Sequence, residues 1–455
     1  MSVAAGAARG RSYSPLGQGV YGSLPVYDEI HALVFGPGGG LRTPHTGCPR
    51  RGVALSPRQV GVVDAQTLDS ELTRDCLAAA AAEPDGETAA AVEVLLRAAW
   101  AQGASDVHVT PEAERFRVRF RLDGVLREVG ALPRARLPLL VQRIKVLAQL
   151  LTYRCDVAQD GRIAAELGGG PGEIRVSILP TLHGEKAVLR LLLGAGPPSL
   201  EGLGWPADAA RELEGVVAAP AGLALFAGPA GSGKTSAIYA ALSAIAARGE
   251  RACASLEEPI EAELPGVDQT PIDRCAGLDF ASGLRAVLRQ DPEVVFVGEA
   301  RDGETARIAV QAGLTGHLVL TTVHAREACS ASLRLLDLGV DPASLAACLD
   351  AVFALRLARR LCAECAGAGG GCCHGSGFRG RAPLVEALPL DDGVRAALSA
   401  RGGLAELRAA AAAAGYTTLA QRAADAVAAG VTSQREAERV LGRGARREEA
   451  HAVSR

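Results

Sequence analysis

The strongest constraint on the fold of this chain is one glycine-rich segment. Residues 228–235 read Gly-Pro-Ala-Gly-Ser-Gly-Lys-Thr, which is a complete G-x-x-x-x-G-K-[ST] phosphate-binding loop. The apolar run Leu223–Ala227 precedes the loop, and alanine-rich sequence from Ser236 to Ala247 follows it. A strand, a loop and a helix in this order are the context that the motif requires, so a chance glycine-rich turn is the weaker alternative. The sequence therefore predicts that the chain binds a nucleoside triphosphate.

The residue types in this loop have separate expected roles. Glycines let backbone N–H groups face phosphate oxygens, and the positive end of the following helix adds to that attraction. We expect Lys234 to reach the β- and γ-phosphates of ATP and Thr235 to ligate Mg²⁺. The predicted nucleotide-binding segment comprises Gly228, Pro229, Ala230, Gly231, Ser232, Gly233, Lys234, Thr235 and Ser236.

Two acidic segments are candidates for the remaining chemistry of nucleotide hydrolysis. The apolar run Val294–Val297 leads to Glu299, which we expect to hold Mg²⁺ through water; a surface glutamate after a buried strand is the alternative. A second apolar run leads to Glu257, Glu258 and Glu261. A carboxylate at a strand end can orient the attacking water. Glu257 is the first candidate for that role, with Glu258 and Glu299 as alternatives, and we expect Glu258 to lie beside the nucleotide. Acidic turns are common on protein surfaces, so the second segment is weak evidence by itself.

Two histidines flank a further apolar run. His317 precedes residues 318–322 and His324 follows them closely. Their separation of seven positions would put them on opposite faces of an ideal strand, which argues against a simple metal-binding pair. We expect His317 to sense phosphate and His324 to lie at the catalytic end of the strand. A structural role is the alternative for each.

Composition limits where such a protein acts. The net charge of −3 gives no overall attraction to nucleic acid or to an anionic membrane. The chain has no uninterrupted run of eighteen apolar residues, and its first fifteen residues lack the apolar core of a signal peptide. We therefore expect a cytoplasmic chain without a membrane span, which reaches any membrane through a partner.

The chain of 455 residues is long enough for two or three domains, and its patterns change along it. Residues 1–88 are predicted to be an irregular leader with a small helix near Leu68–Ala82. Residues 89–193 are predicted to form an α+β domain, which a linker at 194–198 joins to the rest. Residues 199–455 alternate short apolar runs with helical sequence. This part is predicted to be a mainly parallel, doubly wound α/β domain with a helical tail.

Four of the eleven cysteines lie within twelve positions. They are Cys362, Cys365, Cys372 and Cys373. Because disulfide frameworks are rare in cytoplasmic proteins, this cluster predicts a metal site.

Taken together, these segments resemble one family, the secretion ATPases of type II secretion and type IV pilus assembly. Residues 284–302 resemble its Walker B region, residues 315–320 its His box and residues 257–261 its Asp box, where Glu258 stands in place of the usual Asp. Residues 103–108 and 143–146 resemble the domain that precedes the motor. The resemblance extends from about Ala89 to Gly430.

The resemblance implies a P-loop NTPase motor domain of the RecA-like type, a preceding α+β domain and a small zinc module. It also implies a homo-oligomeric ring, usually a hexamer, that works with inner-membrane platform proteins. In the family, arginines of the preceding domain help to bind phosphate. The matching residues here are Arg162 and Arg175, with Arg190 a weaker third.

The zinc module of the family usually has two separated Cys-x-x-Cys pairs. Here Cys362 and Cys365 form the first pair, and Cys373 aligns with the last cysteine, within a module at 362–381. Either Cys372 or His374 remains for the fourth position. Thiolate binds zinc well, which favours Cys372. A reduced, metal-free loop is the alternative, because the spacing is compressed.

We therefore expect an ATP-hydrolysing ring motor that powers type II protein secretion through pseudopilus assembly. One alternative is a type IV pilus assembly ATPase. Another is a degenerate scaffold that binds nucleotide without turnover, because the Asp box and the zinc module depart from the family pattern. A motor that acts on nucleic acid is disfavoured, because no basic or aromatic strand-binding stretch is present.

Overall fold

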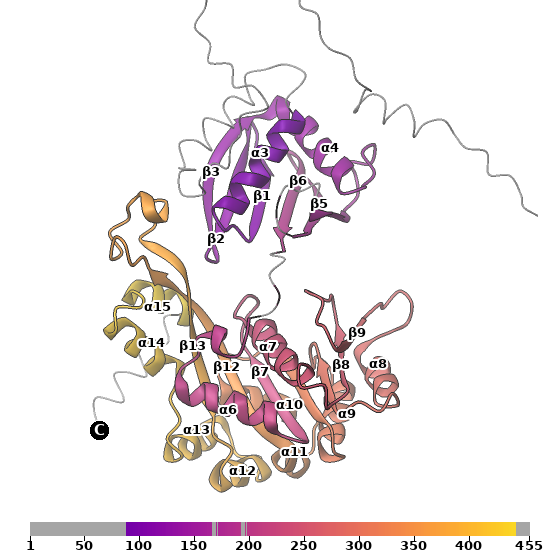
Figure 1. Cartoon of the computed structure of the whole chain (residues 1–455), viewed down its shortest axis with the longest axis vertical. Helices are drawn as coiled ribbons and strands as arrows, with labels where there is room; N and C mark the ends of the chain where they lie inside the picture. Colours follow the sequence, from indigo (N-terminus) through magenta and orange to yellow (C-terminus); the bar gives the residue numbers. More distant parts are fainter. Residues whose placement is uncertain (1–87, 166–169, 171, 193–195, 197, 443–455) are drawn as a thin grey trace, which may run out of the picture. The chain divides into compact units, whose positions relative to one another are not determined.

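The computed structural model describes residues 88–442, apart from residues 166–169, 171, 193–195 and 197 (Figure 1). Nearly all of the predicted leader and most of the predicted linker at 194–198 lie outside the described residues. The helix predicted near Leu68–Ala82 lies outside them as well.

The first part of the described chain is a six-stranded antiparallel sheet with two helices on one face (Figure 1). The order of its strands is β3-β2-β1-β6-β5-β4. Its elements are α3 (Thr88–Ala101), β1 (Asp106–Pro111), β2 (Arg115–Leu122), β3 (Val125–Pro133), η1 (Arg134–Arg136), α4 (Leu137–Leu147), β4 (Gln159–Ile163), β5 (Ile174–Thr181) and β6 (Gly184–Leu191).

Alternating side chains explain why this sheet is covered on one face. Phe116, Val118 and Phe120 of β2 are buried against α3 and α4, while the arginines between them point the other way. Helix α4 ends at Leu147. Gln149 has a positive φ of 57°, and a left-handed residue at this position ends a helix.

The second part contains a seven-stranded sheet with helices on both faces (Figure 1). Its elements are η2 (Glu201–Leu203), α6 (Ala207–Ala218), β7 (Gly222–Ala227), α7 (Lys234–Ala246), β8 (Cys253–Glu257), β9 (Val267–Pro271), α8 (Phe280–Val287), β10 (Val294–Val297), α9 (Gly303–Leu314), β11 (Leu318–Val323), α10 (Ala328–Asp337), α11 (Pro342–Cys348), β12 (Leu349–Leu361), η3 (Gly371–Cys373), β13 (Phe378–Leu388), α12 (Asp392–Ser399), α13 (Leu404–Ala413), α14 (Leu419–Ala428) and α15 (Gln434–Leu441).

This sheet has the order β13-β12-β7-β11-β10-β8-β9 and is parallel except for β13, which pairs antiparallel with β12. Every residue of β7, β10 and β11 is buried. Continuous apolar runs of this kind suit strands that are covered on both faces. Helices α6 and α7 pack on one face, and α8, α9, α10 and α11 pack on the other. The predicted α/β class is confirmed.

Parallel pairing brings the carboxyl ends of these strands to one edge. Val297 of β10 lies opposite Thr321 of β11, which in turn lies opposite Leu225 of β7. Strand β8 runs to Glu257, so this carboxylate belongs to the last residue of the strand. Segments that follow β7, β8, β10 and β11 therefore meet, as expected for a ligand site in a doubly wound sheet. No helix among the described residues has the length and apolar character needed to cross a membrane.

Candidate functional site

The phosphate-binding loop has backbone geometry that only glycine accommodates. Gly228 has a φ of 144°, and a Cβ atom at this position would lie 2.6 Å from the carbonyl oxygen of Leu355 and 2.6 Å from the Oγ of Ser232. Gly233 has a φ of 95° and is the N-cap residue of α7. The loop therefore turns directly into the N-terminal end of α7, where backbone N–H groups remain available to an anion. This arrangement fits the phosphates of a nucleotide.

Lys234 is the cation of the loop. Its Nζ atom donates hydrogen bonds to the carbonyl oxygens of Gly228 at 2.8 Å and Pro229 at 3.0 Å. Burial lowers the pKa of Lys234, and the negative charge of Glu299 opposes that change. Lys234 follows β7 and Glu299 follows β10, so both lie at the edge where the parallel strands end.

Glu299 lies just beyond the end of β10, and both of its carboxylate oxygens have partners. Arg301 Nη2 lies 2.8 Å from Oε2, and His324 Nε2 lies 3.2 Å from Oε1. Asp302, a little further along, caps α9 by accepting a hydrogen bond from the Thr305 amide at 2.8 Å. The loop that carries Glu299 therefore ends at the cap of α9. Within this loop, the contacts with Arg301 and His324 fix the direction of the Glu299 carboxylate.

Glu257 is the buried carboxylate of the site, only 3% exposed at the end of β8. It accepts hydrogen bonds from the hydroxyl of Ser255 at 2.6 Å, the amide of Gln269 at 3.0 Å and the hydroxyl of Tyr239. Three neutral donors thus stabilise it, because a buried carboxylate needs such partners.

Glu258 points away from this network. Its oxygens accept hydrogen bonds from Arg274 at 2.9 Å and 3.1 Å, and Arg301 Nη1 lies 3.7 Å from it. The hydrogen bonds from Arg274 lower the pKa of Glu258, so the carboxylate stays ionised. The Glu258 carboxylate is therefore paired with two arginines, Arg274 and Arg301.

The predicted arginines lie beside the same acidic segment. Arg175 donates a hydrogen bond to the carbonyl oxygen of Ile260, whereas Arg162 is largely exposed and lies 3.7 Å from Glu173. A cleft of about 420 Å³ is lined by residues that include Arg162, Arg175 and Arg190. The structure thus brings these guanidinium groups to one cleft.

The two predicted histidines lie at opposite ends of β11. His324 contacts Glu299, as described above. His317 precedes β11; its Nδ1 atom lies 3.2 Å from the carbonyl oxygen of Ala312, and its own carbonyl oxygen accepts from the amide of Gly222. Because Gly222 begins β7 and the phosphate-binding loop follows the other end, the structure does not bring His317 to the loop.

Two residues of the site were absent from the sequence predictions: Tyr239 and Gln269. Tyr239 is an aromatic residue in an alanine-rich helix, five positions after Lys234, and this contrast is the one signal that marks it. Tyr239 lies on helix α7 and its partner Glu257 on strand β8, so no local pattern links the two residues. Arg301 appeared only as part of the Walker B resemblance.

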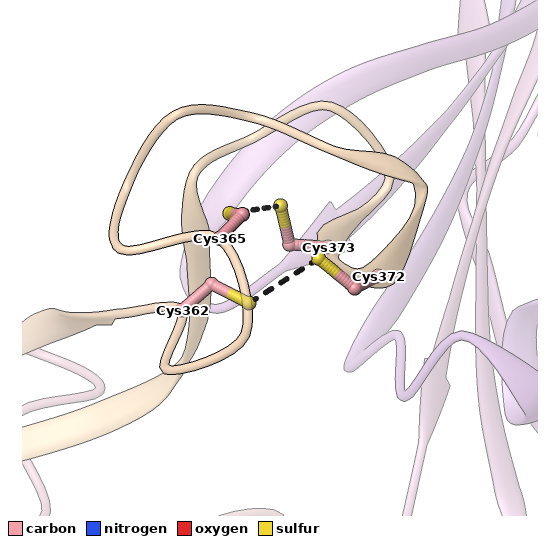
Figure 2. Close-up of side chains that lie close together, drawn as sticks. All are labelled: Cys362, Cys365, Cys372 and Cys373. Carbon is pink, nitrogen blue, oxygen red and sulfur yellow. Dashed lines mark hydrogen bonds between the residues drawn. The ribbon is translucent and has the colours of Figure 1, made fainter.

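The four clustered cysteines converge on one point, as Figure 2 shows. Their sulfur atoms all lie within 4.8 Å of one another. The Sγ atoms of Cys362 and Cys372 are 3.6 Å apart, as are those of Cys365 and Cys373. Tetrahedral zinc with bonds of about 2.3 Å to four sulfurs separates those sulfurs by about 3.8 Å. The donor set therefore fits zinc, and its fourth member is Cys372, not His374.

Backbone groups around the cluster support thiolates. The Gly377 amide donates to Cys373 Sγ at 3.2 Å. Hydrogen bonds from the backbone of Gly370 and Gly369 lower the pKa of Cys365 to about 6. Donors that surround metal-binding sulfurs in this way fix their orientation.

The parallel sheet, the loop before α7 and the carboxylates at adjacent strand ends define a P-loop nucleotide-binding protein. The family model described as "Type II/IV secretion system protein" matches residues 81–439. The chain belongs to this family.

Named relatives agree with this assignment. The chain is 43% identical over 362 residues to the Type II secretion system protein E of Klebsiella pneumoniae, covering 74% of this chain and 72% of the relative. It is 38% identical over 356 residues to the Type IV pilus assembly ATPase PilB of Thermus thermophilus, covering 72% of this chain and 40% of the relative. The crystal structure of the pilus retraction motor PilT with bound ADP has the same fold, with a TM-score of 0.56 at 24% identity, and the match covers 76% of this chain and 96% of that one.

Proposed function

We propose that this protein is an ATPase that drives type II protein secretion through pseudopilus assembly. The observation that carries the proposal is that Lys234, Glu299 and His324 follow three parallel strands and lie at the same edge of the sheet, where His324 contacts Glu299. A cation for phosphate, a carboxylate for the metal shell and a strand-end histidine are parts that nucleotide hydrolysis uses.

The residues of the loop would hold ATP and Mg²⁺. Backbone N–H groups of the loop between Ala230 and Ser236 would receive the phosphates, and the Thr235 hydroxyl would ligate Mg²⁺. Bound Mg²⁺ supplies positive charge that neutralises the phosphate oxygens. Glu299 would act on the metal shell through water. Glu257 would orient the attacking water, and Glu258 serves the site through its contacts with Arg274 and Arg301.

Arginines from the antiparallel sheet would complete the site. Arg175 already contacts the acidic segment at Ile260, and Arg162 lines the same cleft. Cations that approach the phosphates when the protein closes on ATP stabilise the charge of the transition state. His317 could sense phosphate only at the site of a neighbouring protomer, because it lies away from the loop of its own chain.

The biological setting follows the relatives. Type II secretion protein E of Klebsiella pneumoniae is the more similar of the two named relatives, at 43% against 38% identity. The protein would act at the cytoplasmic side of the inner membrane, where it would bind platform proteins. It would form a homo-oligomeric ring, which we expect to be a hexamer. Type IV pilus assembly is the second candidate, which the pilus ATPase relative supports.

The cysteine cluster is proposed to bind one zinc ion with a structural role. Four sulfurs within 4.8 Å of one another leave no open coordination position for chemistry. The ion would stabilise a loop that is too short to build a core of its own.

A genetic experiment distinguishes the two settings. A strain that lacks the gene should retain type II substrates in the periplasm and keep its pili. The wild-type gene should restore secretion, and Lys234→Ala should not. Loss of pili with normal secretion would favour the pilus assembly function instead.

A further inference from the structure

Tyr239 is buried beneath the candidate nucleotide site, with 4% of its surface exposed. It belongs to α7, the helix that begins at Lys234. Its hydroxyl donates to Oε2 of Glu257 and accepts a hydrogen bond from the Glu261 amide at 3.2 Å. One phenol group therefore binds both a carboxylate and a backbone amide of the acidic segment.

The ring of Tyr239 also contacts the strand that leads to Glu299. Its centroid lies 6.4 Å from that of Phe296 in β10, with the rings at 86° in an edge-to-face arrangement. Tyr239 thus links three segments that carry the candidate chemistry. It belongs to the helix that follows the phosphate-binding loop, and it contacts both the strand before Glu299 and residues 257–261. Such a residue can keep these segments in register.

The other partners of Glu257 do not reach the phosphate loop. Ser255 lies on β8 with Glu257 itself, and Gln269 lies on the adjacent β9. Among the described residues, the hydroxyl of Tyr239 is therefore the hydrogen-bond donor that joins the Glu257 carboxylate to α7. Burial and the Glu257 charge raise the pKa of Tyr239, so the phenol keeps the proton that it donates.

We propose that Tyr239 is a positioning residue that holds Glu257 and the backbone of Glu261 at a fixed distance from the phosphate-binding loop. This inference rests on the proposed ATPase function. The loop binds the phosphates without Tyr239, whereas orientation of the attacking water depends on where Glu257 lies. Small displacements of a catalytic group lower the rate of the chemical step far more than they lower binding.

Tyr239→Phe tests the proposal because it removes one hydroxyl and keeps the ring against Phe296. We expect kcat for ATP to fall about tenfold or more, with KM and nucleotide affinity within about twofold of wild type. Hydrogen exchange supplies a readout that does not need turnover. The Glu261 amide should exchange faster in the variant, while the Leu264 amide, which Gln269 holds at 2.7 Å, stays protected.

Tyr416→Phe is the control, because Tyr416 is a partly buried tyrosine beside another buried carboxylate, Glu386. It should leave kcat and the exchange of residues 258–264 unchanged. The double variant Tyr239→Phe, Glu257→Gln should be no slower than Glu257→Gln alone, since both changes disable the same group.

Full kcat in Tyr239→Phe, or unchanged exchange at the Glu261 amide, would overturn the inference. A rise in KM with normal kcat would overturn it too, because that pattern belongs to a nucleotide-binding residue. Absence of turnover in the wild-type protein would instead count against the proposed ATPase function.

Discussion

The Nε2 atom of His324 lies 3.2 Å from the Oε1 atom of Glu299, and this contact joins the segments that follow two adjacent strands. Arg301 holds the second oxygen of the same carboxylate at 2.8 Å. Glu299 is thus oriented from both sides, at the edge where the phosphate-binding loop leaves β7. A carboxylate held in this way is prepared to act on the metal shell of a bound nucleotide.

Replacing Glu299 by glutamine should therefore separate binding from turnover. We expect Glu299→Gln to bind ATP with near-normal affinity and to lower kcat by about a hundredfold or more. Fluorescent-nucleotide titration and steady-state kinetics measure the two effects. Glu304→Gln is the control, because Glu304 is an exposed glutamate in the first turn of α9 and its carboxylate pairs with Arg285. Normal kcat in Glu299→Gln would remove this residue from the proposed mechanism.

Glu257→Gln is expected to have a similar effect for a different reason. The change replaces the buried carboxylate that would orient water, while Ser255 and Gln269 still surround the side chain. We expect kcat to fall by about a hundredfold with ATP still bound. A fully active variant would transfer the role to Glu258 or Glu299.

The arginines of the antiparallel sheet should affect the rate more than the affinity. Arg175→Ala and Arg162→Ala remove cations from the cleft beside the acidic segment, and each should slow hydrolysis by a larger factor than it weakens ATP binding. Arg154→Ala is the control, since Arg154 is an exposed arginine of the same domain that pairs with Asp156. Equal losses of rate and affinity would indicate ground-state binding or misfolding instead.

The cysteine cluster predicts about one zinc ion per chain. Elemental analysis of protein purified without chelator should find it, and Cys362→Ser or Cys372→Ser should lose it, because each removes one of four thiolates. Cys275→Ser, outside the cluster, and His374→Ala should keep it. Absence of metal from the wild-type protein would contradict the site. If zinc is retained in Cys372→Ser but lost in His374→Ala, the fourth ligand is His374 and not Cys372.

Stability at low pH should depend on Glu436. Burial of this α15 residue opposes ionisation, but hydrogen bonds from Arg439 and Arg359 outweigh it and lower its pKa to about 2. Its stabilising effect is therefore complete above the unfolded pKa of about 4.3 and is lost as the pH falls through 2. Glu436→Gln should reduce the free energy of unfolding by about 3 kcal/mol at pH 7.

Chemical denaturation across that range checks the effect. The difference between Glu436→Gln and wild type should shrink steadily below about pH 4.3. Glu212→Gln is the control, because it removes an exposed carboxylate on α6 and leaves the contacts of Glu436 intact. A gap that stays constant down to pH 2 would contradict the assigned pKa.

Apolar runs explain why much of the motor fold could be predicted. The run Val294–Val297 is β10 without any change of bounds, since its four side chains are all buried. Hydrophobicity alone would end strand β8 at Leu256, before the first acidic residue. Glu257 nevertheless continues the strand, since three hydrogen-bond donors compensate its burial.

Contacts between distant segments could not be predicted in this way. The spacing of Tyr239 and Glu257 carries no periodic signal, because their approach depends on how α7 packs on β8. The position of His317 depends on the same kind of information. Its place at the opposite edge follows from the parallel pairing of β7 with β11, which no local pattern fixes. The cysteine cluster was predictable because its four ligands lie within one short loop.

The central claim is that this chain hydrolyses ATP at the loop around Lys234, and release of inorganic phosphate by the purified protein with Mg²⁺ tests it most directly. The account predicts turnover by the wild-type chain, which its platform partners should increase. Lys234→Ala should reduce that turnover to background, because the loop loses the cation that reaches the β- and γ-phosphates. Hydrolysis by Lys234→Ala at the wild-type rate would contradict the proposed site, and a wild-type chain that binds ATP without hydrolysing it would identify a nucleotide-binding scaffold.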